Sequence, residues 1–248
     1  MYQATIERAL RVAHEAHSGQ TRKGSDVPYV LHPIHAALIL SKCDATEDVI
    51  VAIAIAYEVE MRLCEAAFPG IRERGWHHAT LTAFASAAAC ARVMGLDAEK
   101  TAHAIGIAGS RHATLGCVTA GKLTMMKNTV DPMATQAGAW AALLAEEGYE
   151  GPEHVFCGKE GLSDAYGPEW KLEILTDGLG DSWRILECGM KAFPTEALTH
   201  THLSCLLNAM IGNNLEYTDI KEVKVTCFAQ AYDILFDPSK YRPESRET

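Results

Sequence analysis

Histidines and a lysine stand at junctions between predicted elements, where side chains can face a cleft. A Trp-His-His triplet, Trp76 to His78, ends a loop that contains glycine and proline and directly precedes a predicted helix. Lys127 ends a Met-Met-Lys run before another predicted helix, and a Thr-His-Thr-His run carries His200 and His202. Imidazoles transfer protons near neutral pH, and helix N-termini and lysine side chains attract anions. These residue types therefore indicate proton transfer on an anionic substrate.

Simpler structural roles compete with a catalytic role at each of these positions. His78 could cap the helix that follows it or form another local hydrogen bond, and Lys127 could be a solvated surface lysine. His103 lies on an apolar helical segment, where a histidine is more often a hydrogen-bonded structural residue. Residue types and positions alone leave both interpretations open.

The composition restricts the classes of partner. The chain has 248 residues and a formal net charge of -10, which disfavours a broad nucleic-acid-binding surface. An anionic substrate then requires Lys, Arg and His to be concentrated in one pocket. Eight cysteines occur without CxxC spacing or a preceding secretory signal, which favours reduced thiols in a cytoplasmic protein. The longest apolar run, residues 49–57, is too short to cross a membrane.

Most of the elements that would position these side chains are predicted to be helices. Apolar residues recur at helical spacing, and many of them are alanines, whose small side chains favour close packing of helices. Two later segments, 182–193 and 219–232, have the pattern of strands. We therefore expect a mainly α fold, with a helical body followed by an α+β segment and a boundary between them near residues 160–180. The expected helices span residues 2–18, 31–43, 46–67, 78–95, 97–110, 132–148 and 202–211.

The expected helix ends and contacts follow from particular residues. Thr46 and Asp97 are residue types that cap helix N-termini, and each precedes a helical pattern. Residues 80–148 should form a compact antiparallel core in which Ala89 is buried at a helix contact. Gly106 and Gly109 would allow neighbouring segments to approach the helix at 97–110 closely.

The segment from Ala16 to Pro33, AHSGQTRKGSDVPYVLHP, resembles the start of the HD-domain guanosine tetraphosphate hydrolases of the RelA/SpoT type. By this resemblance His32 occupies the position of the first metal ligand, while Arg22 and Lys23 occupy nucleotide-contacting positions. The consecutive His-Asp pair of that family falls here on Tyr57 and Glu58. A metal site needs several converging ligands, so we expect no metal at His32 and a helical hairpin without hydrolase activity.

From residue 51 onward, several separate blocks resemble the MmgE/PrpD family in the order of that family. They are AIAYEVEMRLC, the stretch from RERGWHHATL to HAIGIA, the stretch from MMKNT to PEHVF, and KAFPTEALTHTH. The family includes 2-methylcitrate dehydratase and cis-aconitate decarboxylase. The resemblance implies a helical domain and an α/β lid with the active site between them, and no metal or iron–sulfur cofactor.

The same resemblance implies roles for the junction residues. His77 matches the histidine of the active site, Lys127 matches its lysine, and His200 matches a third active-site position. We therefore expect His77 and His200 to be catalytic. Lys127, His78 and His202 are expected to bind substrate, with no metal-binding residue and no cofactor.

Together these features predict three parts, an HD-like helical hairpin over 1–50, an MmgE/PrpD-like helical domain over 51–165 and a partial α+β lid over 166–248. The function predicted first is a cofactor-independent hydro-lyase acting on a small tricarboxylate such as 2-methylcitrate, a reaction of propionate metabolism. The alternatives are a non-catalytic fragment or interaction module of the same fold, and a metal-dependent guanosine tetraphosphate hydrolase. An incomplete lid would leave apolar surface exposed, so we expect a homo-oligomer, with no membrane partner.

Overall fold

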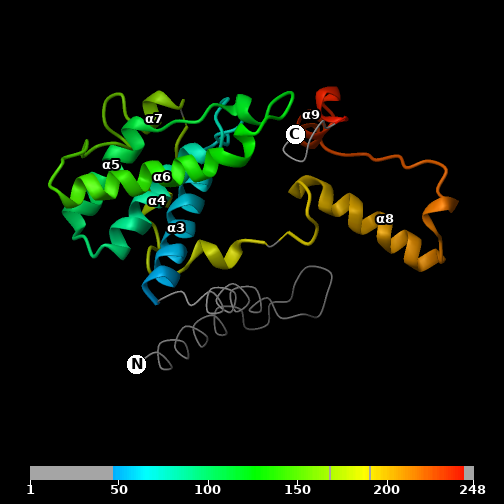
Figure 1. Ribbon diagram of the computed structural model, residues 1–248, viewed down its shortest axis with the longest axis horizontal. Coiled ribbons are helices and arrows are strands. Elements are labelled where there is room, and N and C mark those ends of the chain that lie inside the picture. The colour runs from blue at the N-terminus through cyan, green and yellow to red at the C-terminus, as the bar shows by residue number, and fades with distance from the viewer. Residues whose placement is uncertain (1–46, 168, 190, 243–248) are drawn as a thin grey trace. The chain divides into compact units, whose positions relative to one another are not determined.

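The computed structural model describes residues 47–242 except 168 and 190 (Figure 1). These residues divide into two compact units, of which the first ends at Cys188 and the second begins at Gly189. Each unit is described by itself. The predictions outside the described residues are the helices at 2–18 and 31–43, the cap at Thr46, and the motif residues Arg22, Lys23 and His32.

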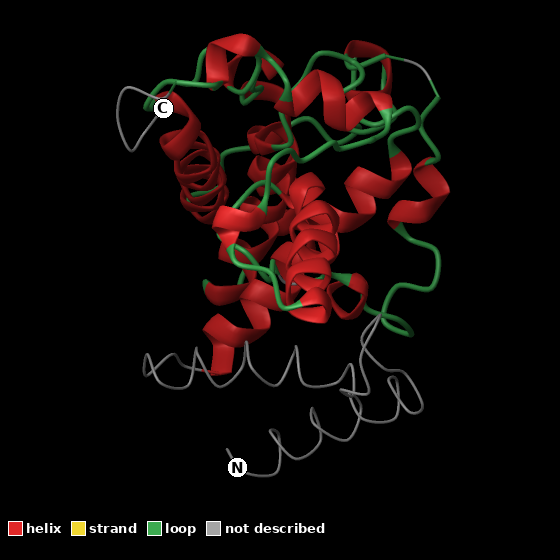
Figure 2. Cartoon of the chain, turned by 90° about the vertical axis from the view of Figure 1, so that its right-hand side faces the viewer, coloured by secondary structure: helices red, strands yellow, loops and turns green. Residues whose placement is uncertain are grey.

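The described chain consists of helices and loops, so the predicted mainly α fold is confirmed (Figure 2). Four long helices build the first unit, α3 (Glu47–Ala66), α4 (Ala79–Val93), α5 (Ala98–Arg111) and α6 (Met126–Glu146). α4 packs against each of the other three, and α5 also packs against α6. α4 is therefore the central helix of this unit.

The turn between α4 and α5 forms as the sequence predicts. Gly95 follows α4 with a φ of +70°, which glycine adopts without the steric penalty of a side chain. The Asp97 carboxylate accepts the backbone N–H of Lys100 at 2.9 Å, so the predicted N-cap of α5 is confirmed. Because α4 ends before Gly95 and α5 is capped by Asp97, the two helices pack side by side after a short connection.

α6 begins earlier than predicted. Its first residue is Met126, so Lys127 lies in the first helical turn rather than before the helix, and Pro132 lies inside it. We predicted the later start because a proline lacks an N–H and disfavours helix in the residue before it. That prediction was wrong. The N–H groups of Lys127 and Asn128 instead close a first turn on carbonyls at 3.1 and 3.0 Å, and the helix continues through the proline.

Small side chains set the distance between α4 and α6. A Cβ added at Gly138 of α6 would lie 2.5 Å from the Ser86 Cβ and 2.7 Å from the Ala83 carbonyl oxygen on α4. Ala89, expected to be buried at such a contact, is only half-buried, because it lies beside the contact faces of α4. The core formed by α4, α5 and α6 consists of Ala83, Ala87, Ala91, Ala104, Ile107, Ala108, Ala141, Ala142 and Ala145.

A second apolar cluster joins α3 and α4 to the chain that follows α6. The Phe84 ring of α4 stacks on Phe156 with 5.3 Å between centroids, and Gly109 of α5 packs directly against Phe84. The short helix α7 (Leu162–Ala165) contributes Leu162 to this cluster. Its buried members are Leu63, Ile71, Leu81, Phe84, Val155, Leu162 and Tyr166.

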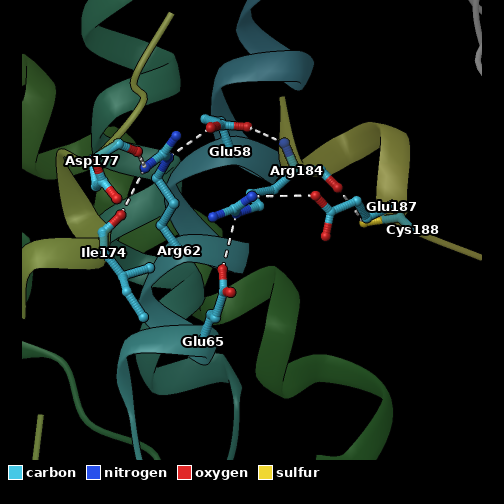
Figure 3. A network of polar contacts seen from close by, with 8 residues as sticks. All are labelled: Glu58, Arg62, Glu65, Ile174, Asp177, Arg184, Glu187 and Cys188. Atoms are coloured by element: carbon cyan, nitrogen blue, oxygen red, sulfur yellow. Dashed lines mark hydrogen bonds and ion pairs between the residues drawn. The ribbon is translucent and has the colours of Figure 1, made fainter. Parts of the chain in front are cut away.

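A buried ion pair on α3 anchors the segment that ends the first unit (Figure 3). Arg62 Nε donates to Glu58 Oε1 at 2.6 Å, and both side chains are almost fully buried. The other Glu58 oxygen accepts the backbone N–H of Arg184 at 2.6 Å. Arg62 Nη1 donates to the carbonyl oxygens of Ile174 and Asp177 at 2.7 and 2.8 Å.

The anchored segment carries two short 3-10 helices, η2 (Leu172–Leu175) and η3 (Arg184–Glu187), and both contact α3. Residues 169–188, which the sequence assigned to the lid, therefore pack within the first unit. The domain boundary at 165 stays a prediction. The Glu58 carboxylate is committed to this network. It could not serve as the metal ligand that the hydrolase alternative requires at this position.

The second unit has little interior of its own. Its main helices are α8 (His200–Asn213), none of whose residues is buried, and α9 (Ala229–Leu235), in which Ala231 is buried. The second unit also contains three 3-10 turns, η4 (Ala197–Thr199), η5 (Tyr217–Asp219) and η6 (Pro238–Lys240). In the first unit, the loop that follows α5 contains the 3-10 turn η1 (Gly116–Val118).

The two predicted strands are wrong. Within the described residues, 182–193 contains η3 and irregular chain. The segment 219–232 begins at the end of η5, has no regular secondary structure over 220–228 and then enters α9. Alternation predicts a strand only where a neighbouring strand accepts its hydrogen bonds. Val223 and Val225, which a half-buried strand would place on the same face, are both exposed.

Among the described helices, none has both the length and the apolar character that crossing a membrane requires.

We predict that Gly138→Ala destabilises the protein although alanine favours helix. The added methyl group would force α6 away from α4, and overpacking of this kind costs about 1–3 kcal/mol. Gly212→Ala on α8 is the matched control, because nothing lies within 4 Å of the added Cβ. Urea denaturation should show a loss for the first variant and none for the second. Equal stabilities would contradict close packing at Gly138.

We also predict that Glu58→Gln destabilises the first unit by about 3 kcal/mol or more, since it leaves the buried Arg62 charge without a counterion. The control is Glu187→Gln. The Glu187 side chain is 68% exposed in its contact with Arg184, so its loss should cost less than about 1 kcal/mol. Similar losses in the two variants would show that the buried pair does not anchor the segment.

Candidate functional site

The His77–His78 turn before α4 is held by pairing with the loop that follows α5. The His77 N–H donates to the Thr114 carbonyl at 2.8 Å, and the Gly116 N–H donates to the Gly75 carbonyl at 2.8 Å. The Thr80 hydroxyl also accepts the Thr114 N–H at 2.9 Å. Backbone bonds on both sides thus fix the direction in which the two imidazoles leave the chain.

His77 is buried, with 2% of its surface exposed. Its Nδ1 accepts the backbone N–H of Ala79 at 3.2 Å. Burial lowers the pKa of His77 to about 4, and the nearby charges of His78 and Arg72 act in the same direction, whereas Asp131 opposes them. His77 is therefore a neutral imidazole near neutral pH.

His78 faces a carboxylate instead of capping the helix. Its side chain makes no capping hydrogen bond to α4, so the capping alternative is wrong. The His78 ring packs on the His77 ring with 3.9 Å between centroids and a 35° tilt. Its Nε2 lies 3.4 Å from Asp131 Oδ1 on α6, and both side chains are half-exposed.

Two carboxylates complete the cluster, and sequence reasoning missed both. The Thr82 hydroxyl on α4 donates to Glu60 Oε1 on α3 at 2.9 Å and lies 3.5 Å from Asp131 Oδ1. Burial raises the pKa of Glu60, and the Asp131 charge adds to that effect. Glu60 carried no distinguishing signal, because Glu58 and Arg62 are charged residues close to it in the same helical stretch. Asp131 and Lys127 both lay outside the helix predicted over 132–148, so their separation by one helical turn could not be seen in the sequence.

Lys127 belongs to the same unit as this cluster. It is exposed in the first turn of α6, and Asp131 follows it one turn later on the same face. The structure thus places His77, His78 and Asp131 together, with Lys127 on the helix that supplies the carboxylate.

His200 and His202 lie in the first turn of α8, in the second unit. The His200 ring meets Phe193 edge to face with 5.4 Å between centroids. Its Nε2 is buried and has no hydrogen-bond partner among the described residues. The convergence of His200 and His202 on His77 stays a prediction, because the two units are described separately. The structural role expected for His103 agrees with its Nδ1 contacts to the backbone of Gly151.

His77, His78 and Asp131 each place one potential metal-ligating atom within 4.8 Å of the others. Imidazole and carboxylate are donors that zinc accepts. The Ala79 N–H competes for His77 Nδ1, and His78 Nε2 already faces Asp131 Oδ1 at 3.4 Å. We therefore interpret the cluster as an acid–base group.

The sequence profile of the MmgE/PrpD N-terminal domain matches residues 7–175, more than half of the chain. The chain belongs to the MmgE/PrpD family. His77 and Lys127 lie inside the matched range, and His200 lies outside it. The range also includes the segment that resembles HD-domain hydrolases, so a separate domain over 1–50 stays a prediction.

Two curated relatives from fungi match part of the chain. The cis-aconitate decarboxylase-like protein oryM of Aspergillus oryzae is 28% identical over 168 residues, covering 64% of this chain and 34% of the relative. The cis-aconitate decarboxylase of Aspergillus terreus is 27% identical over 198 residues, covering 72% of this chain and 39% of the relative. The chain spans well under half the length of either relative.

The raised pKa of Glu60 predicts a pH dependence of stability that Glu60→Gln should remove. The folded state holds this proton above the usual glutamate pKa of 4.5. Its stabilising effect is therefore present at lower pH and is lost as pH rises through the raised value. Glutamine keeps an oxygen that accepts from Thr82 but cannot ionise. In urea denaturation, wild type should lose stability relative to Glu60→Gln as pH rises; a difference independent of pH would contradict this.

Proposed function

We propose that this chain supplies the helical part of the active site of a cofactor-independent lyase that acts on a small tricarboxylate. The observation that carries the proposal is the His77–His78 pair at the N-terminus of α4, beside Asp131 of α6. Family membership and the names of the two fungal relatives support the lyase class and suggest cis-aconitate beside 2-methylcitrate as a substrate.

The proposed reactions share their chemical demands. Loss of water from a tricarboxylate, or loss of carbon dioxide from an unsaturated one, requires proton transfer at a carbon near a carboxylate. Both also require cationic or hydrogen-bonding groups for the remaining carboxylates. In our proposal an imidazole of the His77–His78 pair supplies the first function, and Lys127 supplies part of the second.

His200 and His202 are proposed to complete the site from the second unit, with His200 as the partner in acid–base chemistry and His202 in substrate binding. This arrangement would bring Lys127 and several imidazoles together in a chain of net charge -10. An anionic substrate would pair with the lysine charge and accept hydrogen bonds from the imidazoles. The expected homo-oligomer is a further proposal, motivated by exposed apolar side chains such as Ile211 on α8.

A non-catalytic interaction module is the second candidate. The observation that favours it is α8, which carries leucines and other apolar residues but buries none of them among the described residues. A lid helix in this state would need a further partner before it could close a site. Turnover by the chain decides between the two candidates.

We predict that the full chain converts cis-aconitate, citrate or 2-methylcitrate, with product detected by NMR, and that Lys127→Ala weakens binding of the same acids. A charge-assisted hydrogen bond is worth about 1.5–3 kcal/mol, so Kd should rise about 10- to 100-fold in calorimetry. Lys159→Ala is the control, because Lys159 is an exposed lysine in the loop between α6 and α7. Equal binding by both variants would show that Lys127 does not bind the substrate. Absence of turnover would favour the interaction module.

A further inference from the structure

The two adjacent imidazoles of the cluster have different partners, and this difference separates their roles. We propose that His78, paired with Asp131, is the imidazole that transfers the proton, while His77 stays neutral and donates a hydrogen bond from Nε2 to a substrate carboxylate. The proposal rests on the lyase function proposed above. It reverses the roles that the sequence suggested, in which His77 was catalytic and His78 bound substrate.

The backbone fixes the tautomer of His77. Because the Ala79 N–H donates to Nδ1 at 3.2 Å, that nitrogen carries a lone pair and the hydrogen of the neutral ring is on Nε2. Protonating Nδ1 would turn this hydrogen bond into a contact between two donors. The ring is also buried at the N-terminus of α4, where the helix dipole disfavours a cation.

Charged groups around His77 act in the same direction overall. His78 and Arg72 oppose a positive charge there and Asp131 favours one, and with burial the balance places the pKa of His77 at about 4. A base this weak is poorly matched to proton transfer near pH 7. A neutral N–H group, by contrast, can stabilise negative charge on a bound oxygen without first losing a proton of its own.

His78 has the surroundings of a proton-transfer group. Its Nε2 faces Asp131 Oδ1 at 3.4 Å, which leaves Nδ1 as the nitrogen with a free lone pair. The ring is half-exposed, so a substrate can reach it. A carboxylate in this position orients an imidazole and stabilises the imidazolium that forms. Asp131 is in turn 3.5 Å from the Thr82 hydroxyl, and that hydroxyl donates to Glu60 at 2.9 Å.

In the loss of water, Nδ1 of His78 takes the proton from a carbon next to a substrate carboxylate. The electron pair of that C–H bond forms the carbon–carbon double bond. The C–O bond on the neighbouring carbon breaks, and the hydroxide leaves as water with a proton from solvent, to which His78 later returns its own. Negative charge that builds on the carboxylate is stabilised by the Nε2–H of His77.

The state of the two rings can be measured without turnover. Nitrogen-15 NMR spectra of the full chain, assigned with His77→Gln and His78→Gln, should show His77 neutral with its hydrogen on Nε2 between about pH 5.5 and pH 8. Addition of cis-aconitate should shift the Nε2 proton of His77. A His77 imidazolium at pH 6.5, or hydrogen on its Nδ1, would overturn the proposal.

Turnover provides the second test. Glutamine places an N–H near the position of Nε2, so His77→Gln should retain at least about 10-fold more turnover than His77→Leu. His78→Gln should lose about 10²- to 10⁴-fold and flatten the pH–rate profile, and Asp131→Asn should lower turnover in the same way. Equal inactivity of the two His77 variants, with His78→Gln still active, would overturn the assignment. If wild type turns over no tricarboxylate, the lyase function fails, and the NMR spectra still decide the state of His77.

Discussion

The close contact of α4 with three neighbouring helices is the constraint on which the rest of the first unit depends. Alanine makes up seven of the 15 residues of α4, and Gly138 of α6 lies against the α4 backbone. Small residues at these contacts allow side chains from α3 and α6 to meet above the first turns of α4. The Glu60 and Asp131 carboxylates therefore reach Thr82 and His78, although they come from helices far apart in the sequence. The geometry of the candidate site therefore depends directly on how closely these helices pack.

The helices were predictable because their signals are local. Periodic apolar residues, the Asp97 cap and Gly95 fix α4 and α5 within the sequence itself. The start of α6 was misjudged because Pro132 is a strong local signal that the packing of α6 against α4 overrides. The strand at 219–232 failed for the opposite reason, since a strand depends on a partner that an alternating pattern does not provide.

The candidate site was predictable in part for the same reasons. His77, His78 and Lys127 belong to motifs that stand out in the sequence, and the structure places the histidine pair at the start of α4 as expected. Asp131 and Glu60 are single carboxylates without a motif, and they gain their importance only from helices that meet in three dimensions. The neutral state of His77 was beyond sequence reasoning, because it follows from burial and from one backbone N–H.

The contact at Gly138 also bears on how this protein could change during evolution. Larger residues at Gly138 or Ala83 would need compensating changes on the opposite helix, and single substitutions rarely supply them. The exposed residues in the first turn of α6 carry no such restriction on size. This exposed turn could therefore change by successive single substitutions, while the contact between α4 and α6 diverges slowly and in matched pairs.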